Sequence, residues 1–135
     1  MIGLLYRAAD AIRRRYLQHD HGRMGEDMAH RYLRRRGCTV IARNYRTRSG
    51  SGEIDIVAWH GRTLVFVEVK TRQTEEYGGP ERAVDAEKEQ RLRVAARDYV
   101  RRSGYLLHRT RFDVVSVVLE KAPRIEWLRD AFAHS

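Results

Sequence analysis

The stretch EIDIVAWHGRTLVFVEVK, residues 53–70, decides the fold because it contains two predicted strands and the short turn between them. Both strands are rich in β-branched and aromatic side chains, which favour extended structure. If Gly61 and Arg62 form a two-residue turn, residues whose numbers add up to 123 lie opposite each other. Asp55 then faces Glu68, and Glu53 faces Lys70.

Two facing carboxylates repel each other, so the pair Asp55 and Glu68 requires a positive partner. A hard divalent cation such as Mg²⁺ or Mn²⁺ prefers carboxylate oxygens and would neutralise both. Lys70 projects to the same side as Glu68, because side chains alternate along a strand, and it would stabilise charge on an attacked phosphate. In the alternative interpretation, Glu53 and Lys70 form a cross-strand ion pair and Asp55 is a solvated edge residue. The residues alone leave both open.

The chain before this hairpin contains two amphipathic patterns of helical spacing and one further strand. We expect a basic helix over residues 2–17, a polar linker over 18–23, and a helix that begins at Glu26 and ends with three arginines before Gly37. A strand over residues 39–46 and the flexible loop RSGSG, residues 48–52, then lead into the hairpin.

The chain after the hairpin is expected to form a helix over about residues 81–103 and a strand over 111–119, while 124–132 fits either a strand or a short helix. The order helix, three strands, helix, strand predicts an α/β fold with a mixed central sheet flanked by helices. Residues 1–21 are assigned to a basic N-terminal extension that is helical, and residues 22–135 to a single domain.

Composition narrows the class of partner. The formal net charge is +9, and 24 of the 27 basic residues are arginine, whose guanidinium group binds phosphate in a bidentate manner. This excess favours nucleic acid, although solvated basic faces or an acidic membrane would also account for it. The sequence lacks an apolar run long enough to cross a membrane, and Cys38 has no second cysteine to pair with. We therefore expect a cytoplasmic protein.

The hairpin residues Asp55 and Glu68-Val69-Lys70 resemble the core motif of the PD-(D/E)XK nuclease superfamily, although Ile54 stands where that motif has proline. Further matching segments are Gly25-Glu26, Arg43-Asn44-Tyr45, Gly52 to Asp55, Phe66 to Arg72 and Arg111-Phe112-Asp113. Together they resemble the YraN-type family of bacterial predicted endonucleases, which is similar to archaeal Holliday-junction resolvases. The resemblance covers roughly residues 23–132 and implies a restriction-endonuclease-like fold.

The resemblance also implies the roles of individual residues. Glu26, Asp55 and Glu68 would hold Mg²⁺ or Mn²⁺, and Asp55, Glu68 and Lys70 would be catalytic. Lys88 interrupts an apolar helical stripe, and either contact with the substrate or snorkelling to the surface explains it. The residues expected to bind nucleic acid are Arg34, Arg35, Arg36, Arg43, Arg46, Arg48, Arg72 and Lys88.

The expected function is that of a metal-dependent endonuclease acting on DNA, including branched DNA. The alternative is a binding module of the same fold that does not cleave and acts in recombination or DNA uptake. A homodimer is one assembly that we consider for either function.

Overall fold

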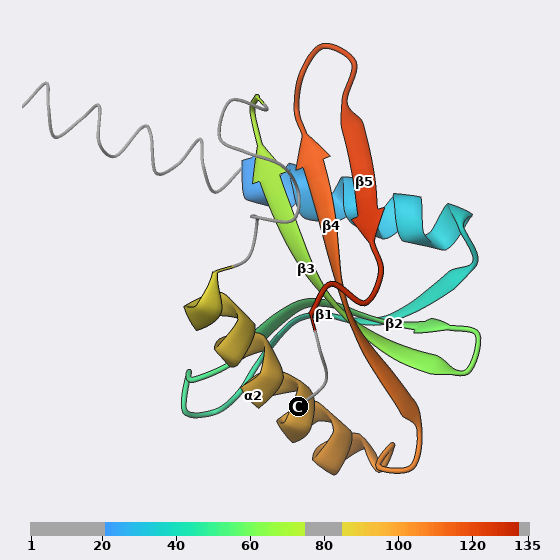
Figure 1. Cartoon of the computed structure of the whole chain (residues 1–135), viewed down its shortest axis with the longest axis vertical. Coiled ribbons are helices and arrows are strands. Elements are labelled where there is room, and N and C mark those ends of the chain that lie inside the picture. Colours follow the sequence, from blue (N-terminus) through green and yellow to red (C-terminus); the bar gives the residue numbers. More distant parts are fainter. Residues whose placement is uncertain (1–20, 75–84, 133–135) are drawn as a thin grey trace, which may run out of the picture.

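The computed structural model describes residues 21–74 and 85–132, which form one five-stranded mixed sheet with a helix on each face (Figure 1). The strands β1 (Cys38–Arg46), β2 (Glu53–His60), β3 (Thr63–Arg72), β4 (Arg109–Val118) and β5 (Arg124–Leu128) lie side by side in chain order. Only β3 and β4 pair in parallel, and α2 (Ala86–Ser103) connects them. The predicted mixed α/β fold is confirmed at this level.

The β2–β3 hairpin has the predicted register. His60 pairs with Thr63 across Gly61 and Arg62, and the pairing continues as far as Ile56 with Val67. Gly61 has a φ of 61°, which the tight two-residue turn requires. The sum of 123 therefore holds throughout the regular part of the hairpin.

The regular pairing of β2 with β3 ends before Asp55, and the pairing of β2 with β1 is interrupted there for one residue. On the β1 side, the pairs Arg43–Ile56 and Tyr45–Ile54 put Asn44 opposite Asp55, and Asn44 has a left-handed φ of 52°. The strand also turns over here, because Ile54 packs on one face of the sheet and Ile56 on the other. Residues two apart in a regular strand would share a face. This kink separates Asp55 from the apolar side chains on either side of it.

The first described helix, residues 21–35, covers one face of the sheet through Ala29 and Leu33, which contact the alternating side chains of β2, β3 and β4. Gly25 brings this helix close to the end of β3, because a Cβ atom there would lie 1.9 Å from Thr71 Oγ1. The helix ends before Gly37, whose φ of 94° is the left-handed conformation typical of such ends.

The helix α2 covers the opposite face through Leu92, Ala95 and Ala96. Its first turn is capped by Asp85, whose carboxylate accepts a hydrogen bond of 2.9 Å from the Lys88 amide. Gly52 allows the β1–β2 loop to lie against the middle of α2, because a Cβ atom would come within 2.8 Å of two backbone atoms of the helix.

Several predicted boundaries need correction. Residues 21–23 are helical, so the predicted linker over 18–23 is wrong in its described part. The ambiguous segment 124–132 contains the edge strand β5, which pairs with β4. The predicted basic helix over 2–17 lies outside the described residues. The helix expected from about residue 81 begins at Ala86, after its cap Asp85. Neither described helix is long and apolar enough to span a membrane.

Candidate active site

Asp55 and Glu68 lie at the first positions beyond the regular β2–β3 pairing. Asp55 Oδ2 accepts a hydrogen bond of 2.8 Å from the Val69 amide, so the carboxylate takes the place of a backbone partner between the strands. The Asp55 and Glu68 carboxyl groups also share a hydrogen bond. The predicted juxtaposition of two acids is therefore present.

Burial is the main reason why the pKa values of both carboxyl groups are raised. Removal from water raises the pKa of Asp55 to about 6, although the Val69 hydrogen bond opposes the change. The pKa of Glu68 rises further, to about 8, because of burial and then because of the charge on Asp55. A cation bound between the two groups would favour their ionised forms and remove most of this cost.

Glu26 approaches the same site from the first helix. Its negative charge is one of the causes that raise the pKa of Asp55. The Gly25–Thr71 contact places this turn of the helix beside the end of β3. Arg43 lies between Glu26, at 3.6 Å, and Asp27, at 2.8 Å. Glu26 is thus near Asp55 but already paired with a guanidinium group.

Lys70 and Lys88 bring positive charge to the pair. The pKa of Lys70 is lowered, first by burial and then by the charges of Lys88 and Arg72. Lys88, on the first turn of α2, lowers the otherwise raised pKa of Glu68. Two cations on different elements therefore act on the half-buried acids, and Lys88 is exposed.

The donors of this site fit a hard divalent cation, because two adjacent carboxyl groups supply oxygen ligands in a shielded position. Within residues 21–74 and 85–132, no three or more His, Cys, Asp and Glu side chains are gathered closely enough to form a complete metal site. Asp55 and Glu68 are the two that the structure brings into contact. The role of Glu26 as a third ligand stays a prediction.

The alternative interpretation of the hairpin depended on a Glu53–Lys70 ion pair. Glu53 instead lies 3.7 Å from Arg46 and 3.8 Å from Arg91, and among the described residues it forms no ion pair with Lys70. Lys70 therefore remains available to the Asp55–Glu68 pair. Arg91 could not be predicted from the sequence, since it is 38 positions from Glu53 and the contact requires α2 to pack on the start of β2.

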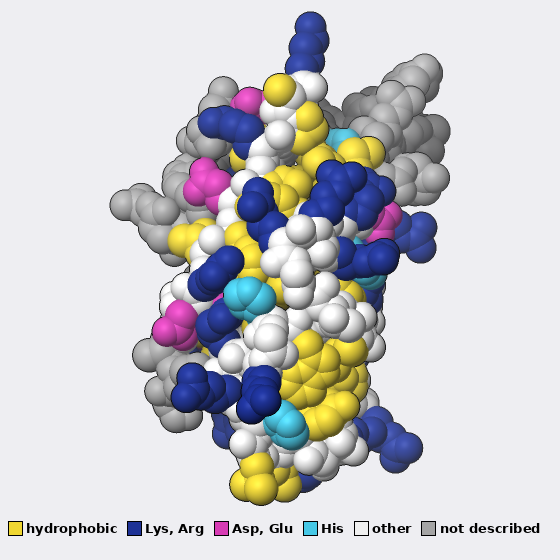
Figure 2. Space-filling model, turned by 90° about the vertical axis from the view of Figure 1, so that its right-hand side faces the viewer, with side chains coloured by type: hydrophobic (Ala, Val, Ile, Leu, Met, Phe, Trp, Pro, Cys, Tyr) yellow, Lys and Arg dark blue, Asp and Glu magenta, His cyan; other side chains and the backbone are white. Residues whose placement is uncertain are grey.

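The arginines predicted to bind nucleic acid have different environments. Arg43 and Arg46 form ion pairs with acids, and Arg72 lies at the end of β3 beside Lys70. Arg36 stacks over the ring of Tyr32 at 4.2 Å. The exposed members are Arg34, Arg35, Arg36, Arg46 and Arg48. Figure 2 shows that basic side chains far outnumber acidic ones over one whole side of the molecule.

The segment of the chain that contains these residues is similar to known proteins. The model of the family described as uncharacterised protein family UPF0102 matches residues 25–117, which include the acids, Lys70 and Lys88. A UPF0102 protein of Solibacter usitatus is 65% identical over 132 residues, covering 98% of this chain and 100% of that protein. The UPF0102 protein HRM2_30940 of Desulforapulum autotrophicum is 48% identical, covering 82% and 91%. A UPF0102 protein of Alkaliphilus metalliredigens is 42% identical, covering 82% and 96%.

Proposed function

The chain belongs to the uncharacterised protein family UPF0102, and within that family we propose that it acts as a divalent-metal-dependent endonuclease on DNA. The observation that carries this proposal is the contact between the Asp55 and Glu68 carboxyl groups at the end of the β2–β3 pairing, with Lys70 two residues further along β3. The mixed sheet with a helix on each face supports a restriction-endonuclease-like fold as part of the same proposal.

The chemistry follows from the roles that these groups can fill. Asp55 and Glu68 would hold the ion, which when bound supplies an acidified water and charge compensation at the phosphate. Lys70 would lie against the phosphate oxygens and stabilise the negative charge that develops during attack. Lys88 would attract the phosphate to the site from the first turn of α2. Each step uses a group that lies at the same end of β3.

DNA is the proposed substrate because the molecule combines this site with a net charge of +9. The motif resemblance to Holliday-junction resolvases makes four-way DNA the first branched form to test. Binding without cleavage is the competing function, and the acids discriminate between the two. A module that only binds phosphate gains nothing from two half-buried carboxyl groups at its centre.

The experiment compares wild-type protein with Glu68→Gln and Lys70→Ala on linear, flapped and four-way DNA in Mg²⁺ or Mn²⁺. Glu68→Gln removes a proposed metal ligand, and Lys70→Ala removes a charge needed mainly in the transition state. Cleavage should fall by about 10² or more in each variant, by analogy with the loss of one stabilising group at other active sites. DNA retention should survive, since most phosphate contacts lie elsewhere.

Matched controls are Glu126→Gln on β5 and Lys121→Ala in the segment before β5, because both residues are exposed. These variants should cleave like wild type. Highly purified wild type that binds DNA but never cuts it with either metal would replace the endonuclease with the binding module. Equal cleavage by wild type, Glu68→Gln and Lys70→Ala would show that the site assignment is wrong.

A further inference from the structure

A basic groove lies between the β1–β2 loop and the C-terminal half of α2, away from the acids. The cavity has a volume of about 440 Å³, and its lining combines hydroxyl groups from the loop with charged side chains from the helix. Its residues are Thr47, Arg48, Ser49, Ser51, Val94, Arg97, Asp98, Arg101 and Arg102. Four arginines and one acid give the lining a formal charge of +3.

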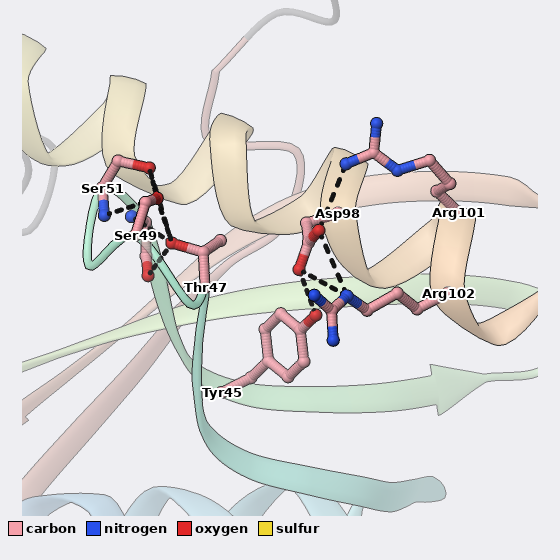
Figure 3. A network of polar contacts seen from close by, with 8 residues as sticks. Tyr45, Thr47, Ser49, Ser51, Asp98, Arg101 and Arg102 are labelled. Carbon is pink, nitrogen blue, oxygen red and sulfur yellow. Dashed lines mark hydrogen bonds and ion pairs between the residues drawn. The ribbon is translucent and has the colours of Figure 1, made fainter.

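The loop wall is a cluster of hydroxyl groups (Figure 3). Ser49 Oγ and Ser51 Oγ lie 2.6 Å apart, and Thr47 Oγ1 lies 3.3 Å from Ser49 Oγ. The Gly52 amide donates to Thr47 Oγ1 over 3.1 Å, which fixes the base of the loop. Hydroxyl groups held in this way can reorient their protons toward an anion, and serine and threonine are common partners of nucleic-acid phosphates.

The helix wall holds its arginines in place through Asp98. The Asp98 carboxylate accepts hydrogen bonds from the Tyr45 hydroxyl and from Arg101 and Arg102, as Figure 3 shows. These partners, Tyr45 first, lower the pKa of Asp98 and keep it ionised. The single acid of the groove is therefore neutralised within the protein and does not repel an incoming anion.

Arg48 and Arg97 are the two arginines of the groove whose charge is not neutralised within the described part of the chain. Both side chains are exposed, and neither forms an ion pair or hydrogen bond with any residue in the described part of the chain. One comes from the loop and the other from the helix, so they approach the cavity from its two walls. This arrangement allows one guanidinium group from each wall to contact the same anion or two successive ones.

The groove continues the active-site edge of α2. Positions 88, 91, 95, 98 and 102 recur at intervals of three and four and therefore lie along one stripe of the helix. Lys88 acts on Glu68 at one end, Arg91 pairs with Glu53, and Asp98 and Arg102 line the groove. From Lys88 to Arg97, the helix arginine of the groove that has no partner among the described residues, the distance along the helix axis is about 14 Å, at 1.5 Å per residue.

We propose that this groove binds a backbone phosphate of DNA about four nucleotides from the phosphate at Asp55 and Glu68. The separation follows from the distance between Lys88 and Arg97, since about 14 Å corresponds to about four steps of 3.4 Å along a duplex. The groove thereby sets the minimum length of the DNA arm that the protein engages. This inference rests on the proposed function for its substrate, but the groove's binding of DNA can be measured without cleavage.

The test compares Arg48→Ala/Arg97→Ala with the control Arg62→Ala/Arg109→Ala. Both double variants remove two exposed arginines that have no partner among the described residues, so net charge and folding are matched. Binding of a fluorescent duplex is measured over a range of salt concentrations. The groove variant should bind about tenfold more weakly at low salt and lose about 0.9 from the slope of log K against log salt, as expected for one lost phosphate contact, and the control should change much less.

Cleavage of flapped DNA supplies the second readout. The groove variant should be slower than the control when the duplex arm extends more than about four base pairs from the cleaved bond, and equal to it when the arm is shorter. Equal DNA binding by the two double variants would overturn the groove and leave the endonuclease untouched. Groove-dependent binding without any cleavage would do the reverse. Binding to phosphatidylserine vesicles but not to DNA would overturn both.

Discussion

Asp55 lies where the pairing of β2 with β3 ends and where the pairing of β2 with β1 is interrupted for one residue. Asn44 opposite it is left-handed, and the Val69 amide on the other side donates to its carboxylate. The side chain is therefore fixed in the sheet by a backbone hydrogen bond and not by packing on a face. The same hydrogen bond favours the ionised form of Asp55, which partly offsets its burial. A rigidly held carboxylate with one oxygen anchored is well prepared to bind a cation through the other.

At the scale of single residues, the sequence predicts which acids meet, but it does not predict the backbone geometry that brings them together. Alternation and a two-residue turn suffice to pair Asp55 with Glu68. The kink cannot be predicted in this way, because it depends on Asn44 in a third segment. Asp113 illustrates the same limit: it is fully buried, and Arg111, Trp127 and the Asp130 amide all donate to it. Its sequence neighbours indicate only the first of these partners.

The Asp55–Glu68 pair makes stability depend on pH and on metal. The pKa of Glu68 is about 8 in the folded protein, against an ordinary value of 4.5. Between these values the folded state retains a proton that the unfolded state has lost, so stability without metal falls as pH rises through this interval. Mg²⁺ binds the deprotonated acids, so the gain in melting temperature on adding it should increase over the same interval.

Thermal unfolding from pH 5 to pH 8.5, with and without millimolar Mg²⁺, measures both effects. Glu68→Gln should flatten the fall in melting temperature, and Asp55→Ala should abolish the gain from Mg²⁺. Glu126→Gln should behave like wild type because its side chain is exposed on β5. If adding Mg²⁺ at pH 8 did not change the melting temperature of the wild-type protein, the metal site would be ruled out.

Among the elements, the two helices reach the site by different means. The first helix depends on the absence of a side chain at Gly25, and α2 depends on Gly52 at the end of the β1–β2 loop. The sequence predicts both helices from periodicity, since the buried Leu33 and Leu92 lie on clear apolar faces. It does not predict the groove, because Arg101 and Arg102 look like ordinary cations of a last helical turn. Only the packing of the loop against α2 gives them a shared cavity.

Gly25→Ala should displace the first helix from β3. The new Cβ would overlap Thr71 Oγ1 at 1.9 Å, and overpacking of this kind costs about 1–3 kcal/mol of stability. Gly22→Ala is the matched control in the same helix, because no atom of the described residues lies within 4 Å of the Cβ that alanine would add there. Alanine there should be neutral or stabilise the protein by up to about 1 kcal/mol.

Chemical denaturation of the two alanine variants provides the comparison, and adding Thr71→Ala to Gly25→Ala should restore part of the loss by removing Oγ1. Because Gly25 precedes Glu26, the Gly25→Ala variant should also show a weaker gain in stability from Mg²⁺. Equal stability of the Gly22 and Gly25 variants would contradict the close contact between this helix and β3.

For the whole molecule, the arrangement separates a small acidic centre from a broadly basic exterior. The net charge of +9 attracts a polyanion from any direction, whereas Arg43 and Arg46 are paired with acids of the protein itself. Arg34, Arg35 and Arg36 lie at the opposite end of the first helix from Glu26, about 12–15 Å along its axis. A duplex that contacts both this end and the acids must extend across the molecule.

Salt dependence tests whether those three arginines contact DNA. Each phosphate contact contributes about 0.9 to the slope of log K against log salt, so Arg34→Ala/Arg35→Ala/Arg36→Ala should lower the slope by up to about 2.7. Arg36 stacks on Tyr32, so the triple variant is compared with Arg34→Ala/Arg35→Ala to separate that contact. Fluorescence anisotropy with duplex and four-way DNA gives the slopes, and Arg62→Ala/Arg109→Ala controls for the loss of net charge. If the triple variant lost no more slope per removed arginine than this control, the end of the first helix would lie outside the DNA-binding surface, and the attraction would come from net charge alone.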